Sequence, residues 1–471
     1  MGEYDRLEAL DDSFLQLESL DTPMHVGALS VFDGESLIDD SGRFRLADAR
    51  ETVASRLHLV PRFRKRLMEV PLGLGRPIWV DDDRFDVAFH VRLTALPRPG
   101  TWEQLAALTT RVQSQLLDRS RPLWEIWFVE GLEDGRIGLI QKTHHAMVDG
   151  ASGVDVATVL LDFDPEPVHL DPPEWAPEAA PSPVGLLVDS LREQITEPKE
   201  LVERVGAVVR APVRAVEQGL GLARSIGTMI GRDTVAPRTS LNKAVGRHRS
   251  FDVVRVPLAD AKSVREALGG TVNDVVLAAV GAGLDRLLES RGETADHVRA
   301  MIPVSVRSDE ENLQLGNRVS AMFVNLPTST PGPAERLDAV REVTSDLKES
   351  HQAVGAEFLV GLTRYAVPTL LNLAARAVQH QPFFNLVVTN VPGPQQPLYM
   401  LGARMLEAFP IVPLAKNLTI GIAILSYDGA LDIGVWADSD AAPDVEVLSA
   451  GIEDGFAELR KVADERSPHP A

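Results

Sequence analysis

The chain has 471 residues, and its 47 basic against 68 acidic side chains give a formal net charge of −21. At about 150 residues per domain this length suggests two or three domains, and 44% hydrophobic with 24% charged residues is typical of a folded globular protein. So acidic a balance argues against nucleic-acid binding, which requires a basic surface. The absence of cysteine excludes disulfides, thiolate metal sites and a cysteine nucleophile.

No targeting or membrane segment is evident in the sequence. The first ten residues are charged and lack the apolar core of a signal peptide. No run reaches the roughly 18 uninterrupted apolar residues that a membrane span requires. We therefore expect a cytoplasmic protein, with peripheral attachment to the inner membrane or to a lipid-droplet surface as an open alternative.

The first 170 residues mix helical periodicity with short strand-like runs, at 126–129 and 136–143. Five prolines then crowd residues 171–183, and such a density predicts a linker because proline fits neither a helix interior nor a central strand. From 184 to 231 apolar residues recur near the helical period, with Pro212 expected to kink or split the helix. The local excess of basic residues there fits either a crossover helix between domains or a helix lying on a lipid surface.

Strands and helices alternate again after residue 239. Residues 251–257 read as an edge strand, 272–288 as a helix, and 419–425 with 431–436 as a hairpin around Asp428-Gly429. The predicted fold is therefore α/β, with mixed sheets flanked by helices. We place one domain at 1–170, a proline-rich and helical linker at 171–238, and a second domain at 239–471.

The most specific feature is a pair of adjacent histidines, His144 and His145, followed by Asp149-Gly150. Alternation over 137–143 predicts a strand, and Ser152 with Asp155 resembles a capping box, so the histidines fall at a strand-to-helix turn. Adjacent side chains of an extended chain point to opposite faces. Only one histidine can then address a given pocket, and we expect the other to be packed and hydrogen-bonded.

The residue types favour acid–base chemistry at this turn. Two adjacent histidines lack the i, i+4 spacing of a helical zinc site, and no Gly-x-Ser-x-Gly nucleophile motif is present. No metal site is therefore expected. A neutral imidazole can take a proton from a hydroxyl or thiol and return it within one cycle. The alternative is a pair of structural histidines in a loop.

Several further motifs occur in a fixed order along the chain. They are Pro23-Met24-His25-Val26-Gly27, Pro122-Leu123-Trp124-Glu125, Asn273-Asp274-Val275-Val276-Leu277, Pro303-Val304-Ser305-Val306-Arg307, Gly316-Asn317 and Asn390-Val391-Pro392-Gly393-Pro394. The histidine motif is the signature of the chloramphenicol acetyltransferase-like superfamily. With the other motifs, the chain closely resembles the bacterial wax ester synthase/diacylglycerol acyltransferase family from about residue 10 to 452.

This resemblance implies two acetyltransferase-like domains joined by a helical crossover, with the active site in a tunnel between them. It implies acyl-CoA as co-substrate, with no resident cofactor, and diacylglycerol or a long-chain fatty alcohol as acceptor. By motif, His145 would be the general base and His144 a supporting residue. Asp149 would orient the loop, and Asn273 would position the reacting groups.

Three alternatives stay open at this level. Asn273 could serve only the start of its helix, where Thr271 and Asp274 form a capping box. The basic run Arg62, Arg64, Lys65, Arg66 could attract CoA phosphates or be a solvated face. The protein itself could use a carrier-bound donor or another alcohol, or it could bind lipid without catalysis.

Overall fold

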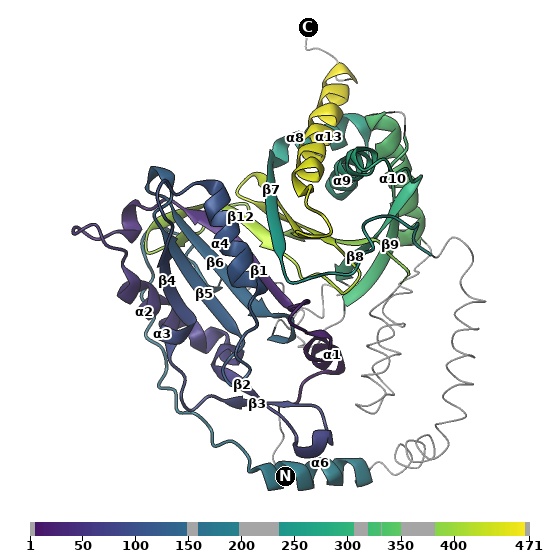
Figure 1. Ribbon diagram of the computed structural model, residues 1–471. Helices are drawn as coiled ribbons and strands as arrows, with labels where there is room; N and C mark the ends of the chain where they lie inside the picture. Colours follow the sequence, from purple (N-terminus) through teal and green to yellow (C-terminus); the bar gives the residue numbers. More distant parts are fainter. Residues whose placement is uncertain are drawn as a thin grey trace.

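The computed structural model describes residues 5–147, 159–196, 235–305, 319–330, 332–349 and 382–466. These residues form two six-stranded sheets, each flanked by helices, and a small two-stranded sheet. The two large sheets lie next to each other (Figure 1). The predicted fold class, α/β with two mixed sheets, is confirmed.

The first large sheet has the strand order β11-β12-β1-β6-β5-β4. Its strands are antiparallel except for the parallel pair β4–β5. The strands are β1 (His25–Phe32), β4 (Val91–Ala95), β5 (Trp124–Glu130), β6 (Ile137–His144), β11 (Tyr399–Met400) and β12 (Ala403–Ile411). Both strand-like runs predicted in this part of the chain are confirmed, as β5 and β6.

Short helices accompany this sheet, together with the two-stranded sheet of β2 and β3. Helix α4 begins at a Thr101–Gln104 capping box, which satisfies backbone N–H groups that the first helical turn leaves unpaired. The elements are α1 (Ala9–Leu17), α2 (Leu46–Arg56), β2 (Lys65–Met68), β3 (Ile78–Asp81), α3 (Val87–His90), α4 (Trp102–Ser114) and the 3-10 helix η6 (His145–Met147).

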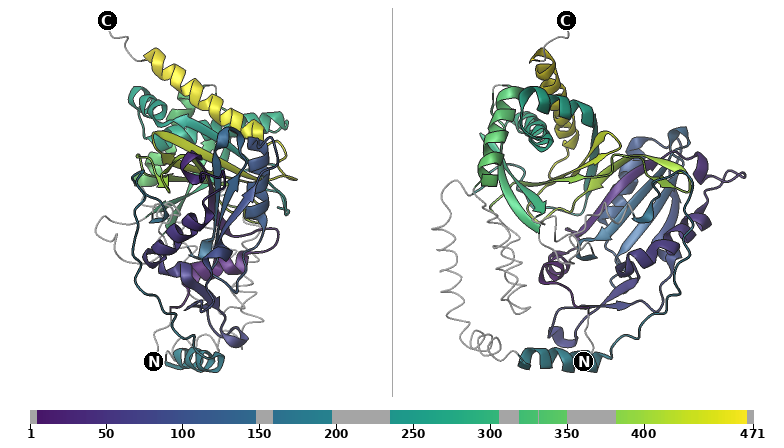
Figure 2. Two further views of the ribbon diagram at one scale, coloured as in Figure 1. Left: turned by 90° about the vertical axis from the view of Figure 1, so that its left-hand side faces the viewer. Right: turned by 180° about the vertical axis from the view of Figure 1, so that it is seen from behind.

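The second large sheet has the order β7-β14-β13-β10-β8-β9, with helices against it (Figure 2). Strand β7 lies at its edge, as the sequence predicts. The strands are β7 (Arg249–Pro257), β8 (His297–Ser305), β9 (Val319–Pro327), β10 (Leu386–Pro392), β13 (Ile420–Tyr427) and β14 (Ala430–Asp438). The helices are α8 (Leu258–Leu268), α9 (Val272–Ser290), α10 (Pro333–Glu349) and α13 (Val445–Arg466).

The predicted hairpin is confirmed in β13 and β14. Its two turn residues, Asp428 and Gly429, have φ values of 43° and 79°. Positive φ at both central positions is the requirement of a type I′ turn, and Asp-Gly meets it at little steric cost. The predicted helix at 272–288 is α9, which supplies much of the apolar core of the second half.

The first large sheet is not built from the first half of the chain alone. Strands β11 and β12 come from the last third of the chain, yet β12 pairs antiparallel with β1 in the first sheet. A core cluster also joins α4 to the second half, where Leu105 and Val112 pack in one cluster with Phe251 and Trp436. The predicted domain boundaries stay predictions, and the two halves share a strand pair and a core.

The proline-rich segment 171–182 has no helix or strand, as predicted, and it ends where α6 (Pro183–Thr196) begins. Ser182 Oγ accepts the N–H of Gly185 at 3.1 Å, and Pro183 occupies a first-turn position that needs no N–H. Leu186 of α6 packs on Val70 and Ile78 of the first half. Pro212 and most of the basic helical stretch lie outside the described residues.

In the part of the chain that the structure describes, no single helix is long and apolar enough to cross a membrane.

Candidate active site

The two histidines lie at the end of β6, where the strand gives way to η6. The backbone N–H of His144 donates to the carbonyl of Leu123 at 2.9 Å, and that of His145 donates to the carbonyl of Met24 at 2.8 Å. Leu123 and Met24 belong to two of the sequence motifs that flank the histidines at a distance. Those motifs therefore fix the backbone on which both imidazoles stand.

His144 is the packed histidine of the pair, with no exposed surface. Its Nδ1 accepts the N–H of Ala146 at 3.0 Å, so the ring proton is on Nε2. That Nε2 lies 3.3 Å from Oε1 of Glu18. The orientation and tautomer of His144 are thus set by a backbone amide on one side and a carboxylate on the other.

Glu18 connects several groups around this turn. Its Oε1 lies 3.3 Å from Nε2 of both His25 and His144, and its Oε2 accepts from Arg119 at 2.9 Å. The N–H of Met24 also donates to Oε1, at 3.3 Å. Burial acts to raise the pKa of Glu18, but hydrogen bonding with His144 and His25 outweighs it, and the pKa lies well below its usual range.

His25, on the neighbouring strand, completes this network from the other side of Glu18. Its Nδ1 donates to the carbonyl of Gln113 at 3.1 Å, and its Nε2 faces Glu18. The side-chain amide of Gln113 donates to the carbonyl of Gln141 at 2.6 Å, across Gly27. A Cβ at Gly27 would lie 2.2 Å from that carbonyl oxygen, which accounts for the glycine of Pro23-Met24-His25-Val26-Gly27.

His145 has different surroundings, as the alternation argument predicts for the second of two adjacent residues. Its ring is half-buried and stacks on the ring of Phe14 from α1, with centroids 3.8 Å apart and planes inclined by 21°. Its Nδ1 is buried and has no hydrogen-bond partner among the described residues.

Burial lowers the pKa of His145 to about 4, so its imidazole is neutral at pH 7. A neutral imidazole with a free nitrogen lone pair can accept a proton from a hydroxyl group. The two histidines thus differ: His144 is fixed by hydrogen bonds on both ring nitrogens, and His145 is a half-buried neutral imidazole. Although His25, His144 and Glu18 are of types that bind metals, no such group in the described part of the chain is arranged to hold a metal ion.

The family model described as "wax ester synthase/diacylglycerol acyltransferase catalytic domain" matches residues 7–276. The model of the WS/DGAT C-terminal domain matches residues 315–460. The chain belongs to the wax ester synthase/diacylglycerol acyltransferase family. It is similar to a probable diacylglycerol O-acyltransferase of Mycobacterium tuberculosis, at 34% identity over 98% of this chain and 96% of the relative. A putative diacylglycerol O-acyltransferase of the same species is 33% identical, over 97% of this chain and 99% of the relative.

Solved structures agree with this WS/DGAT membership. The wax ester synthase/diacylglycerol acyltransferase of Marinobacter aquaeolei VT8 aligns with a TM-score of 0.66 at 27% identity, covering 98% of this chain and 100% of that one. The starter condensation domain of rhizomide synthetase aligns with a TM-score of 0.55 at 14% identity, covering 98% and 95% of the two chains. That second likeness shows a common fold.

Of the other predicted WS/DGAT site residues, Asn273 is among the described residues and Asp149 is not. Asp149 lies outside the described residues, as does the predicted capping box at Ser152. Asn273 stands in the first turn of α9, where Thr271 and Asp274 form the capping box. Its Oδ1 accepts from the side-chain amide of Asn390 at 3.0 Å, so Asn273 is not needed to cap the helix. Within the described residues, no hydrogen bond joins Asn273 to either histidine of the motif.

Sequence reasoning missed two residues that contact the WS/DGAT histidines, Glu18 and Phe14. Both lie just upstream of Pro23-Met24-His25-Val26-Gly27, and that proximity was the available signal. An isolated glutamate or phenylalanine has no diagnostic spacing, so only the fold reveals the contacts.

Three of the four basic residues in the run 62–66 have partners within the protein. Arg62 and Lys65 contact the carboxylate of Asp5 at 3.4 Å and 2.9 Å. The guanidinium of Arg64 is buried and lies over the ring of Trp175. These contacts favour the structural alternative over attraction of CoA phosphates.

Proposed function

We propose that this protein transfers a fatty acyl group from acyl-CoA to the hydroxyl of diacylglycerol, and also to long-chain alcohols. The observation that carries the proposal is His145, a half-buried neutral imidazole at a strand end whose backbone is fixed by Met24. Family membership and the similarity to the mycobacterial diacylglycerol O-acyltransferases support the choice of donor and acceptor.

The reaction follows from the chemistry of one base. Nε2 of His145 accepts the hydroxyl proton as the alcohol oxygen attacks the thioester carbonyl. The new C–O bond forms, the C–S bond breaks, and the imidazolium returns the proton to the departing CoA sulfur. The products are an ester and free CoA, and no covalent enzyme intermediate is required.

Two further residues have supporting roles in this proposal. Asn390 donates to Oδ1 of Asn273, which leaves the N–H groups of Asn273 available to orient a substrate oxygen. Asp149 orients the loop after the histidines, as the family motif implies. Because the acyl-CoA donor is a cytoplasmic metabolite class and the acceptor is a lipid, we place the enzyme in the cytoplasm, bound peripherally to the inner membrane or to lipid droplets.

The test is release of CoA from palmitoyl-CoA by the purified protein, with dioleoylglycerol or hexadecanol as acceptor and thin-layer chromatography of the lipid products. Because a positioned acid–base group contributes about 10²- to 10⁴-fold, we expect His145→Ala to lower turnover by that factor. His169→Ala is the matched control, since the side chain of His169 is 72% exposed.

Each outcome of this assay assigns the function differently. Acceptor-dependent release that His145→Ala abolishes supports the proposal, and the better acceptor identifies the preferred product. Equal turnover in His145→Ala and wild type contradicts the role of His145 as base. Turnover with an acyl carrier protein but not with acyl-CoA would reassign the donor, and lipid binding without turnover would leave a non-catalytic protein.

A further inference from the structure

The segment 18–25 contacts both histidines of the motif. Glu18 approaches His144, the carbonyl of Met24 accepts from His145, and His25 lies beside Glu18. Between Glu18 and Met24 the chain folds into a tight turn. The backbones of Ser19 and Thr22 exchange two hydrogen bonds of 3.2 Å, and their hydroxyl groups lie 2.8 Å apart.

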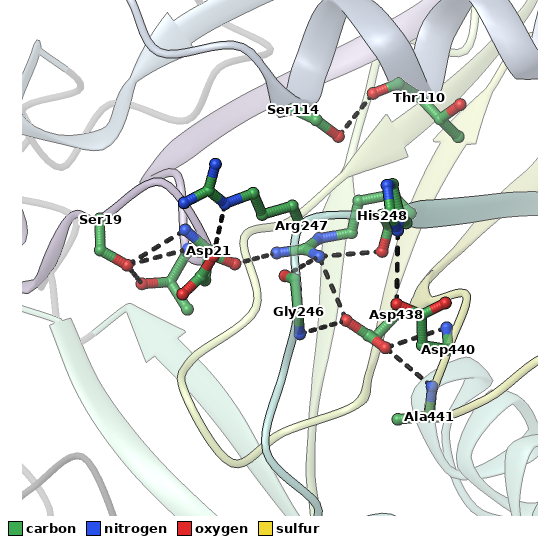
Figure 3. Close-up of polar contacts among 12 residues, drawn as sticks. Ser19, Asp21, Thr110, Ser114, Gly246, Arg247, His248, Asp438, Asp440 and Ala441 are labelled. Carbon is green, nitrogen blue, oxygen red and sulfur yellow. Dashed lines mark hydrogen bonds and ion pairs between the residues drawn. The ribbon is translucent and has the colours of Figure 1, made fainter.

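Two arginines from the second half of the molecule, Arg247 and Arg249, bind this turn. Figure 3 shows Arg247 beside Asp21. Nη2 of Arg249 donates to the backbone carbonyl of Asp21, and Nε of Arg247 donates to the Asp21 carboxylate at 3.0 Å. Both arginines lie at the start of β7. The turn that carries the partners of the histidines is therefore held by the opposite half of the fold.

The two arginines differ in burial and in anchoring. The Arg249 side chain is 2% exposed and pairs with Asp438, which is 1% exposed, whereas Arg247 is 64% exposed. Nη1 of Arg249 also donates to the carbonyls of Gly246 and His248, at 2.7 Å and 3.0 Å. Arg249 thus has a fixed geometry, while an exposed ion pair such as that of Arg247 contributes little.

A second observation connects Arg249 to the histidine network. Arg249 and His25 line the same small cavity between the two halves, of about 10 Å³, together with Gln113 and Trp436. Gln113 is the residue whose carbonyl accepts from His25. The guanidinium therefore borders the histidine network as well as holding the turn beside it.

We propose that Arg249, anchored by Asp438, is a positioning residue for acyl transfer, which acts by holding the turn 19–22 so that Glu18 and Met24 keep the histidines in place. The inference rests on the proposed function and adds a residue from the other half of the fold to it. Displacing groups near a reacting centre by about 1 Å can cost about 10²-fold in rate, so loss of this contact should lower kcat.

The test combines a spectroscopic and a kinetic readout. Because the chain has no cysteine, Leu20→Cys gives a single labelling site on the turn, at a side chain that is 55% exposed. A nitroxide spin label there reports the order of the turn by its electron paramagnetic resonance line shape, without substrate. Turnover of palmitoyl-CoA with dioleoylglycerol gives kcat and KM in the same background.

The main variant is Arg249→Lys, which keeps a positive charge beside Asp438. A single ammonium group cannot replace the planar guanidinium, whose two terminal nitrogens contact Asp438 and the Asp21 carbonyl at the same time. We expect a more mobile label and a kcat lowered about tenfold or more, with KM for acyl-CoA within about threefold of wild type. Arg247→Lys is the matched control on the same turn residue, and we expect it to change neither readout.

A second variant keeps the test decisive if Arg249→Lys folds poorly. Asp438→Asn can keep the oxygen that accepts the N–H groups of Asp440 and Ala441. It replaces the other oxygen, which accepts from Gly246 and from Arg249, and so weakens the charged anchor of Arg249. It should shift both readouts in the same direction by a smaller amount. Wild-type line shape and kcat in a folded variant of either kind would overturn the proposal.

The two readouts also separate this proposal from the one on which it rests. A label that becomes mobile in Arg249→Lys, in a protein whose wild type transfers no acyl group, overturns the proposed function and the catalytic consequence drawn here. An unchanged label in an active wild type overturns the positioning role of Arg249 alone.

Discussion

At the scale of single residues, the site is organised by one carboxylate. The side chain of Glu18 is 3% exposed and lies against two histidines, an arginine and a backbone amide. A carboxylate in such surroundings accepts charge-assisted hydrogen bonds, which are shorter and stronger than neutral ones. His144 is thereby fixed in one tautomer, and its neighbour His145 stands on the same short stretch of backbone.

We predict that Glu18→Gln lowers kcat by about tenfold or more, while KM for acyl-CoA stays within about threefold. Glutamine is nearly isosteric, but it removes the charge and has a single acceptor oxygen, so its NH2 group must face either Arg119 or the donors of His144 and Met24. We expect the substitution to misalign His144 and His145 without unfolding the protein. Steady-state kinetics of CoA release, with circular dichroism to verify folding, measure this effect.

Glu35→Gln is the matched control, because Glu35 is exposed and distant in sequence from the motif. It should leave both kinetic constants unchanged. Wild-type kcat in folded Glu18→Gln would show that the carboxylate holds the fold without aligning the reaction.

At the scale of elements, the contact between β12 and β14 joins the two large sheets. Strand β12 belongs to the first sheet and β14 to the second, and they touch where Gly434 faces Pro410. A Cβ at Gly434 would lie 2.0 Å from the Pro410 carbonyl oxygen, much closer than any contact that real Cβ atoms make. The missing side chain is what lets the two strands approach.

We predict that Gly434→Ala destabilises the protein by about 2–3 kcal/mol, since a backbone oxygen must move to admit the methyl group. Without that contact, alanine in a strand would be neutral or stabilising. The shift of the urea midpoint measures the effect. Gly246→Ala is the control, because its nearest neighbour would lie at an ordinary 3.4 Å, and a loss as large in that variant would contradict the steric explanation.

The contact between β12 and β14 also separates the features that local sequence patterns predict from those that they do not. Alternation and turn chemistry are local, and they correctly predict β6, β7, α9 and the Asp428-Gly429 hairpin. The pairing of β12 with β1 joins residues more than 370 positions apart in register, such as Gly27 with Ile411, and no local pattern encodes it. Proline density likewise locates the linker but not the packing of α6 on the first half.

The candidate site likewise contains residues that the sequence predicts and residues that only the tertiary contacts reveal. The histidine motif identifies His144 and His145, and strand alternation predicts that one is packed and the other available. The function of Pro122-Leu123-Trp124-Glu125 and Pro23-Met24-His25-Val26-Gly27 as backbone supports depends on tertiary contacts. So do the contributions of Glu18 and Phe14, because a carboxylate or an aromatic ring becomes specific only through what it touches.

At the scale of the whole molecule, a buried carboxyl group lies where the two sheets meet. Asp432 of β14 is fully buried, and its Oδ2 accepts the N–H of Ala408 from β12 at 2.8 Å. Arg255 lies 3.4 Å from its other oxygen. Burial raises the pKa of Asp432 to about 6, and the Ala408 hydrogen bond and Arg255 offset this only in part.

The raised pKa makes stability depend on pH in a defined direction. The folded protein holds this proton up to about pH 6, whereas the unfolded chain releases it near the ordinary aspartate pKa of 3.8. Stability from the protonated carboxyl is therefore complete below about pH 4 and is lost as pH rises through 6. The ionised group then costs the native state about 2–3 kcal/mol at pH 7 and above.

We predict that Asp432→Asn stabilises the protein at pH 8 by up to about 2–3 kcal/mol, because asparagine keeps an oxygen for the Ala408 N–H and carries no charge. The advantage should shrink between pH 6 and pH 4, where the wild-type carboxyl becomes protonated in both states. Urea midpoints across pH 4–8 measure it, with exposed Asp40→Asn as the control that should follow wild type. A stabilisation of Asp432→Asn that does not vary with pH would mean that packing, rather than the buried charge, sets the stability of the contact between the sheets.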